Sequence, residues 1–111
     1  MNVYDKAYDL AKALKDSSEA EQLKTAKRAM EADPEASRIM EGFRERQMEL
    51  QQKMMSGEEP TEAEMASITK LYEEIAGNPL IASVLEAERQ LAVVFEDINR
   101  LLNDVLKAIA G

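Results

Sequence analysis

Carboxylates are the only side chains in this sequence that are plentiful enough to support chemistry. Four pairs of acids lie close together along the chain: Glu58 and Glu59, Glu73 and Glu74, Glu86 and Glu88, and Glu96 and Asp97. Oxygen ligands of this kind could hold Ca²⁺ or Mg²⁺, yet no segment has the alternating ligands and central glycine of an EF-hand loop. Adjacent acids also point to different faces of a helix. We therefore interpret them as solvated and helix-capping groups, and we predict no metal site.

Two residue types that carry much of enzyme chemistry are missing, because the sequence has neither cysteine nor histidine. Disulfides, thiolate or zinc sites, cysteine nucleophiles, Ser-His-Asp triads and histidine-containing di-iron sites are therefore excluded. The sequence also has no glycine-rich phosphate loop and no GxSxG motif. We predict that the protein is not an enzyme, has no catalytic residues and takes no cofactor.

The charge is strongly uneven along the chain. Residues 56–111 carry four basic and eleven acidic side chains, a net charge of −7 out of −8 for the whole sequence. This half should repel nucleic acid and anionic lipid. The basic residues of the first half alternate with Glu at helical spacing, which favours a solvated face over an RNA-contact patch. No apolar run approaches the roughly 20 residues of a membrane span, and residues 1–14 do not resemble a signal peptide. We expect a cytoplasmic protein without direct contact to nucleic acid or membrane.

Hydrophobic spacing and capping residues predict that residues 1–111 form a single all-helical domain. The first helix runs over 3–15, and Ser18, with Glu21 three residues later, is predicted to cap the second. The remaining boundaries follow from further caps and helix stops: Asp33 before Pro34, Gly57, Thr61 with Glu64, Gly77, and Asn78 before Pro79. The prediction is an all-α bundle of about five helices, with two long ones at about 34–55 and 79–110.

The helix at 34–55 has an apolar stripe that contains a polar residue. Met40, Phe43, Leu50 and Met54 follow a heptad-like spacing in which Gln47 occupies the central position. Two roles are open for Gln47: a hydrogen bond that fixes the register of packing, or contact with a separate partner. The methionines are likewise interpreted as core residues, with an adaptable binding surface as the alternative.

The helix at 79–110 is the most informative element. Apolar residues repeat every seven positions along it, and they form a wide apolar face over four heptads. At 1.5 Å per residue the helix is about 48 Å long, whereas a compact domain of this size is only about 34 Å across. We therefore predict that the protein oligomerises through this helix, as a homodimer or a tetramer. The predicted interface residues are Val84, Leu91, Val94, Phe95, Ile98, Leu101, Leu102 and Val105.

Several short segments, in this order and spacing, resemble the YheA/YmcA/YlbF family of small bacterial helical proteins, and the YheA branch most. The segments are 3–7 (VYDKA), 10–14 (LAKAL), 33–36 (DPEA), 43–47 (FRERQ), 50–53 (LQQK), 57–59 (GEE), 78–79 (NP) and 86–88 (EAE). The resemblance implies a cytoplasmic oligomer from a Gram-positive bacterium. It also implies a link to a complex, formed by the YlbF and YmcA branches with a third protein, that influences RNA processing. Those branches hold an iron–sulfur cluster on cysteines, which this sequence lacks.

Three hypotheses for function follow. The first is a non-enzymatic helical interaction protein that self-associates and contacts other proteins. The second is an adaptor or regulator of an RNA-processing complex, by analogy with the cysteine-bearing relatives. The third is a helical bundle that binds a small apolar molecule. A surface for a separate partner is predicted on the helix at 34–55, at Arg44, Arg46, Gln47, Gln51 and Gln52.

Overall fold

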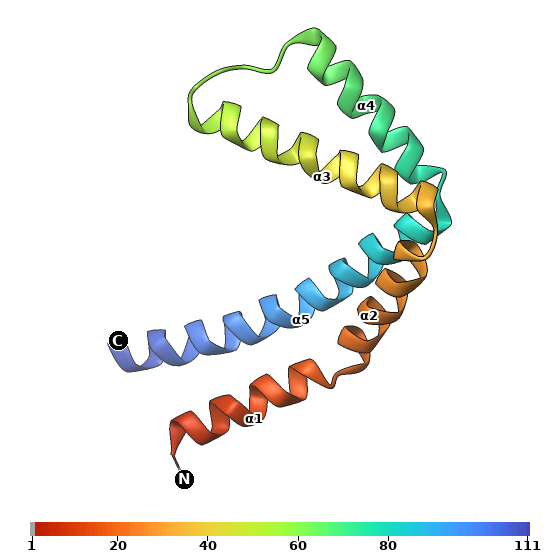
Figure 1. The fold of residues 1–111 in the computed structure, drawn as a ribbon. Coiled ribbons are helices and arrows are strands. Elements are labelled where there is room, and N and C mark those ends of the chain that lie inside the picture. The colour runs from red at the N-terminus through yellow and green to blue at the C-terminus, as the bar shows by residue number, and fades with distance from the viewer. Residues whose placement is uncertain (1) are drawn as a thin grey trace. The chain divides into compact units, whose positions relative to one another are not determined.

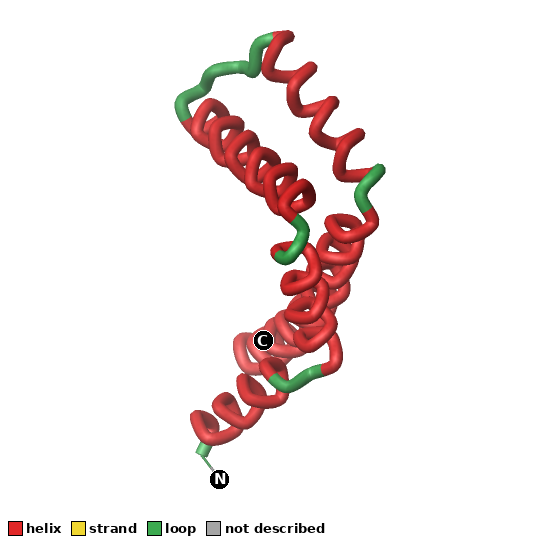
Figure 2. The backbone as a smooth tube through the Cα atoms, turned by 45° about the vertical axis from the view of Figure 1, so that its right-hand side comes forward, coloured by secondary structure: helices red, strands yellow, loops and turns green. Residues whose placement is uncertain are grey.

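The computed structural model describes residues 2–111, and over that range the chain forms five helices and no strand (Figure 1). The helices are α1 (Val3–Lys15), α2 (Ser18–Glu31), α3 (Pro34–Met55), α4 (Glu62–Ala76) and α5 (Pro79–Ala110). Short loops join them, and the longest loop follows α3 (Figure 2). The predicted all-α fold with long helices at 34–55 and 79–110 is confirmed. None of the helices within 2–111 combines the length and the apolar character needed to cross a membrane.

Three of the predicted helix starts are built as the sequence suggests, and the capping box of Thr61 with Glu64 at the start of α4 is one of them. The Asp33 carboxylate accepts hydrogen bonds from the backbone N–H groups of Glu35 and Ala36. The Asn78 side chain does the same for Leu80 and Ile81, at 3.1 and 3.3 Å. Each cap satisfies two of the N–H groups that have no partner inside their own helix.

The start of α2 differs from the prediction by one residue. Ser17, and not Ser18, caps this helix, because its hydroxyl accepts a hydrogen bond from the Ala20 N–H at 3.2 Å. Its carbonyl oxygen accepts the first helical bond, from the Glu21 N–H at 3.0 Å. The residue three positions after Ser17 is Ala20, so the predicted capping box with Glu21 does not form.

The end of α3 is closed by a glycine. Gly57 has a φ of 78°, in the left-handed region that favours glycine. The Glu58 N–H donates to the Lys53 carbonyl at 2.9 Å, and the Gly57 N–H donates to the Met54 carbonyl at 3.2 Å. These paired bonds form a Schellman motif, which ends α3 and turns the chain toward α4.

The chain divides into two compact units, which we describe separately. One unit comprises residues 27–83, with α3 and α4 as an antiparallel hairpin. Phe43 and Tyr72 meet edge to face across this hairpin, with ring centroids 5.4 Å apart. The buried apolar residues of this unit, among those described, are Met30, Ala36, Ile39, Met40, Phe43, Ile75 and Ile81. The expected organisation as one domain stays a prediction.

The other unit comprises residues 1–26 and 84–111, and it has a much smaller core. α1, all of which the structure describes, has no buried residue. Within residues 2–26 and 84–111 the buried apolar side chains are Ala20, Val84 and Ala87, two of them alanines. A strongly amphipathic pair of helices therefore leaves most of its apolar surface uncovered.

Candidate interaction surfaces

The outer part of α5 carries the largest run of exposed apolar residues in the described chain. Every residue from 99 to 111 is exposed. Five large apolar side chains in this stretch keep between 57% and 79% of their surface open: Leu101, Leu102, Val105, Leu106 and Ile109. We call these five, together with Leu91, Val94, Phe95 and Ile98, the α5 face. A contiguous apolar face of this kind on a folded protein marks an interaction surface.

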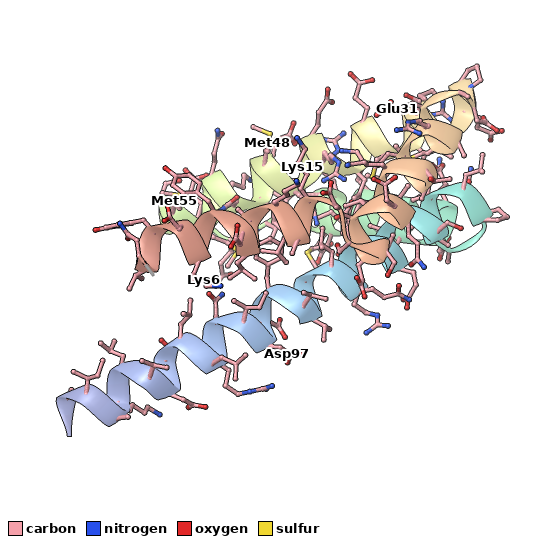
Figure 3. All side chains as sticks on the ribbon, turned by 90° about the horizontal axis from the view of Figure 1, so that it is seen from below. Lys6, Lys15, Glu31, Met48, Met55 and Asp97 are labelled. Carbon is pink, nitrogen blue, oxygen red and sulfur yellow. The ribbon has the colours of Figure 1, made fainter. Side chains whose placement is uncertain are left out.

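Near the middle of α5, this face adjoins α1. A groove of about 360 Å³ is lined by Ala11, Leu14, Lys15, Ala20, Leu91 and Phe95. In Figure 3, α1 (with Lys6 and Lys15 labelled) lies alongside α5 (with Asp97 labelled). Val3, Tyr4 and Tyr8 on α1 are also largely exposed. α1 thus covers only one edge of the apolar face.

The structure narrows the predicted interface on α5. Val84 has no exposed surface within the single chain, so we leave it out of the interface that we propose below. Leu91, Val94 and Ile98 are half-buried. The other predicted residues, Phe95, Leu101, Leu102 and Val105, are exposed, and the structure adds Leu106. The signal for Leu106 was its position four residues after Leu102, which places both on one side of the helix.

The opposite side of α5 is polar. Arg100 donates to the Asp97 carboxylate at 2.9 Å, and both side chains are mostly exposed. With about 100° between successive residues, Asn103 and Lys107 also point away from the apolar face. The outer half of α5 is therefore amphipathic, with its apolar side open to a partner.

The α3–α4 hairpin has two different sides. One side is apolar and is formed by Gln47, Leu50 and Met54 of α3 with Met65, Ile68 and Tyr72 of α4; we call it the hairpin face. Part of it encloses about 30 Å³, and the lining residues are Phe43, Arg46, Gln47, Leu50, Ile68, Leu71 and Tyr72. The other side is a polar groove of about 300 Å³ lined mainly by Arg38, Glu45, Glu49, Ser67, Lys70 and Glu74.

An ion pair joins the two helices of the hairpin near its loop. The Lys53 ammonium donates to the Glu64 carboxylate, and both side chains are under one-third exposed. This hydrogen bond holds the pKa of Glu64 below its ordinary value of 4.5, and bonds from Thr61 lower that pKa further. The same bond raises the pKa of Lys53 above its ordinary value of 10.5. These shifts fit a structural tie between helices, since neither pKa moves toward neutral pH as a catalytic acid or base requires.

The predicted partner surface on α3 is divided between the two sides of the hairpin. Gln47 lies on the hairpin face, is exposed, and makes no side-chain hydrogen bond to any residue within 2–111. It therefore does not fix the register of α3 against α4. Arg46 pairs with Glu49 at 2.8 Å and borders the polar groove. Arg44, Gln51 and Gln52 are exposed.

The acidic pairs that opened the sequence analysis do not converge. Within the described residues, no three carboxylates come together in a way that could hold a metal ion. Glu86 instead binds Arg89 on the same helix, which lowers the pKa of Glu86. The geometry thus offers surfaces for contact, and it gathers no set of reactive groups.

Comparison with known proteins identifies the family. The family described as "Control of competence regulator ComK, YlbF/YmcA" matches residues 3–107. A UPF0342 protein from Alkalihalophilus pseudofirmus is 41% identical over 110 residues, which cover 99% of this chain and 93% of that protein. The UPF0342 protein YheA of Bacillus subtilis is 35% identical over 111 residues, which cover 100% of this chain and 95% of YheA.

Two solved structures share the fold. A protein of unknown function (DUF964) from Bacillus stearothermophilus matches with a TM-score of 0.87 and 23% identity, covering 95% of this chain and 92% of that one. Bacillus subtilis RicA, crystallised in complex with RicF, matches with a TM-score of 0.72 and 18% identity, covering 98% and 96%. The family match and the bacterial relatives confirm the resemblance seen in the sequence, and the chain belongs to the YlbF/YmcA family.

Proposed function

We propose that this protein is a non-enzymatic interaction protein that self-associates through the α5 face into a dimer or a higher oligomer. The observation that carries the proposal is the exposure of Leu101, Leu102, Val105, Leu106 and Ile109 on one side of a helix. Such side chains are normally buried in a stable helical protein. The small core of the unit that contains them adds to the argument.

The energy available is adequate for a reversible complex. Burying a Leu, Ile or Val side chain contributes about 1.5–3 kcal/mol, so these five contribute on the order of 10 kcal/mol per chain. Association costs about 4–15 kcal/mol in lost translational and rotational freedom. Two chains together gain on the order of 20 kcal/mol, which exceeds this cost by about 5–16 kcal/mol. That range includes the roughly 8 kcal/mol of a micromolar complex, so we expect association that depends on concentration in the micromolar range.

A second copy of the same chain suits this face for two reasons. Residues 99–111 contain Arg100, Asp104 and Lys107, a net charge of +1, although the chain as a whole carries −8. Two copies of this segment therefore do not repel each other strongly. A two-fold dimer also uses the same patch on both subunits. A heptad repeat suits such a patch, because the apolar side chains of one helix can pack between those of the same helix in the second copy.

The test is a pair of charged substitutions on the exposed part of the face. We expect the double variant Leu101→Asp with Val105→Asp to sediment as a monomer at concentrations where the wild type is a dimer or larger. Both side chains are more than half exposed in the single chain, so the substitutions should not unfold a monomer. Analytical ultracentrifugation across the micromolar range measures the outcome.

The matched control is Asn103→Asp with Lys107→Gln, which makes the same change of net charge, −2, on the polar side of the same helix. We expect this control to associate as the wild type does. A monomeric wild type with α5 fully helical, or two double variants that behave alike, would contradict the proposal.

A second candidate function is an adaptor for a heteromeric regulatory complex. The match to a family named for control of a competence regulator, and the structure of RicA with RicF, support it. For this function, we expect affinity purification of the tagged protein from its own host to recover a defined protein partner that influences RNA processing. Recovery of the tagged protein alone, from extracts in which a known complex survives, would count against it.

A further inference from the structure

The hairpin face is an apolar surface in the unit formed by residues 27–83, and it is separate from the α5 face. Met54, Met65 and Tyr72 keep 69%, 49% and 54% of their surface exposed, while Leu50 and Ile68 beside them are half-buried. α3 and α4 are close at Phe43 and Tyr72 and diverge toward their connecting loop (Figures 1 and 2). The hairpin face has a small enclosed pocket beside Phe43 and Tyr72, and we call the whole apolar surface the trough.

The shape of the trough excludes a small molecule as its main occupant. The enclosed part measures about 30 Å³, whereas sites for small ligands usually measure about 300–1,000 Å³. The apolar side chains instead form a long, open surface about three helical turns in length, from Phe43 to Met54. A surface of this kind fits the ridge of side chains on a helix, as in helix-in-groove recognition.

Methionine and glutamine dominate the α3 edge of the trough. Met54 on this edge is 69% exposed. Met48 and Met55, labelled in Figure 3, are also exposed, but they lie about 140–160° around α3 from Leu50 and belong to another side of the helix. Flexible thioether side chains adapt to different apolar partners, and exposed methionines are typical of surfaces that bind helices. Gln47 has no side-chain partner within residues 2–111, so its amide is free to bind a partner's polar group.

The α3–α4 hairpin as a whole is acidic, and Arg46, which lines the enclosed part of the hairpin face, is paired with Glu49. Residues 34–76 carry five basic and ten acidic side chains, a net charge of −5. Glu62 and Glu73 fall on the edge of α4 that points away from α3, because about 100° separates successive residues. Glu59 lies in the loop. None of these three carboxylates forms an ion pair with another residue in the described range 2–111, so they offer unmatched negative charge beside an apolar surface.

From these observations we propose that the hairpin face is the docking site for a basic amphipathic helix of another protein. The apolar side of the incoming helix packs against Leu50, Met54, Met65 and Ile68. Its basic residues lie along the α4 edge, where Glu62 and Glu73 attract them. This site does not depend on self-association through α5, since it uses the other unit of the chain.

The experiment uses a designed peptide as the probe. The protein contains no tryptophan, so one Trp on the apolar side of a Leu/Lys helical peptide of about 18 residues reports its own burial by fluorescence. We expect saturable binding with a blue shift of the Trp emission. A Leu/Glu peptide with the same apolar pattern should bind at least about tenfold more weakly.

Two pairs of charge reversals separate docking from general attraction to an acidic protein. Glu62→Lys with Glu73→Lys should weaken binding of the basic peptide at least about tenfold. Glu45→Lys with Glu74→Lys makes the same change of net charge in the polar groove on the opposite side, and it should change binding less than about threefold. Equal effects from the two pairs would overturn the proposal.

A second set of variants tests the apolar contact and the alternative occupant. Met54→Gln with Met65→Gln keeps side-chain length and helix propensity, and it should weaken peptide binding at least about tenfold. Leu101→Asp with Val105→Asp should leave peptide binding unchanged whether or not it abolishes self-association. Loss of self-association in the methionine variant would instead show that a second copy occupies the hairpin face, and would overturn the proposal.

Discussion

Glu64 shows how one side chain can define both a helix start and a contact between helices. Its carboxylate accepts hydrogen bonds from the Thr61 N–H and hydroxyl, which completes the capping box of α4. The same carboxylate binds Lys53 of α3. Because the hydrogen bond to Lys53 favours the charged form, the pKa of Glu64 is lower in the folded chain than in the unfolded chain.

This shift predicts a defined pH dependence. A carboxyl with a depressed pKa stabilises the fold above its unfolded value of about 4.5, and this stabilisation disappears as the pH falls through the lower folded value. Lys53 contributes below about 10.5 and loses its contribution as the pH rises through its higher folded pKa. We expect Glu64→Gln to be less stable than wild type at pH 7, and we expect this difference to shrink as the pH falls below 4.5. Urea unfolding at several pH values measures this difference.

Glu62→Gln provides the comparison for this prediction. Glu62 belongs to the first turn of the same helix, but its carboxylate forms no ion pair within the described residues. We expect this variant to keep most of the wild-type stability at pH 7. If the two variants lose the same free energy of unfolding at every pH, the ion pair with Lys53 does not stabilise the hairpin.

At the scale of the elements, the turn between α3 and α4 decides the shape of the hairpin. Gly57 adopts a φ of 78° with open space where a Cβ would lie, so backbone strain is the only cost of a side chain there. Gly77, which ends α4, has a φ of −86° and only ordinary contacts around an added Cβ. The two glycines therefore differ in what they require.

We predict that Gly57→Ala lowers the free energy of unfolding by about 1 kcal/mol, because alanine is strained in the left-handed region. Gly77→Ala, the comparison, should change it by less than about half of that, since its backbone is accessible to any residue. Chemical denaturation measures both. If Gly77→Ala loses more free energy of unfolding than Gly57→Ala does, the left-handed backbone at Gly57 does not explain why a glycine is needed there.

At the scale of the whole molecule, the apolar surface is divided between two purposes. The unit formed by residues 27–83 buries Met, Ile and Phe side chains inside the chain. The unit formed by residues 1–26 and 84–111 buries Val84 and two alanines among its described residues, and it leaves Leu101, Val105 and Ile109 exposed. If α5 self-associates as proposed, the stability of this second unit depends on protein concentration. A second copy binds only the folded chain, so a higher protein concentration shifts the folding equilibrium toward the folded state.

Local features of the fold were predictable because they depend on neighbouring residues. Asp33, Thr61 and Asn78 cap helices through bonds to atoms two or three residues away, and Gly57 takes a φ that few other residues accept. The choice between Ser17 and Ser18 was not predictable, since both are good caps and the cost of moving the helix start by one residue is small.

The sequence by itself determined the five helices, the heptad repeat of α5 and the absence of histidine and cysteine chemistry, since each of these follows from residue type and spacing along one segment. Only the tertiary structure decided which members of the repeat are open. Val84 and Val105 occupy equivalent positions three heptads apart, yet the first is fully buried and the second is 57% exposed. Burial depends on what the rest of the chain places beside a residue, and periodicity within one helix does not contain that information.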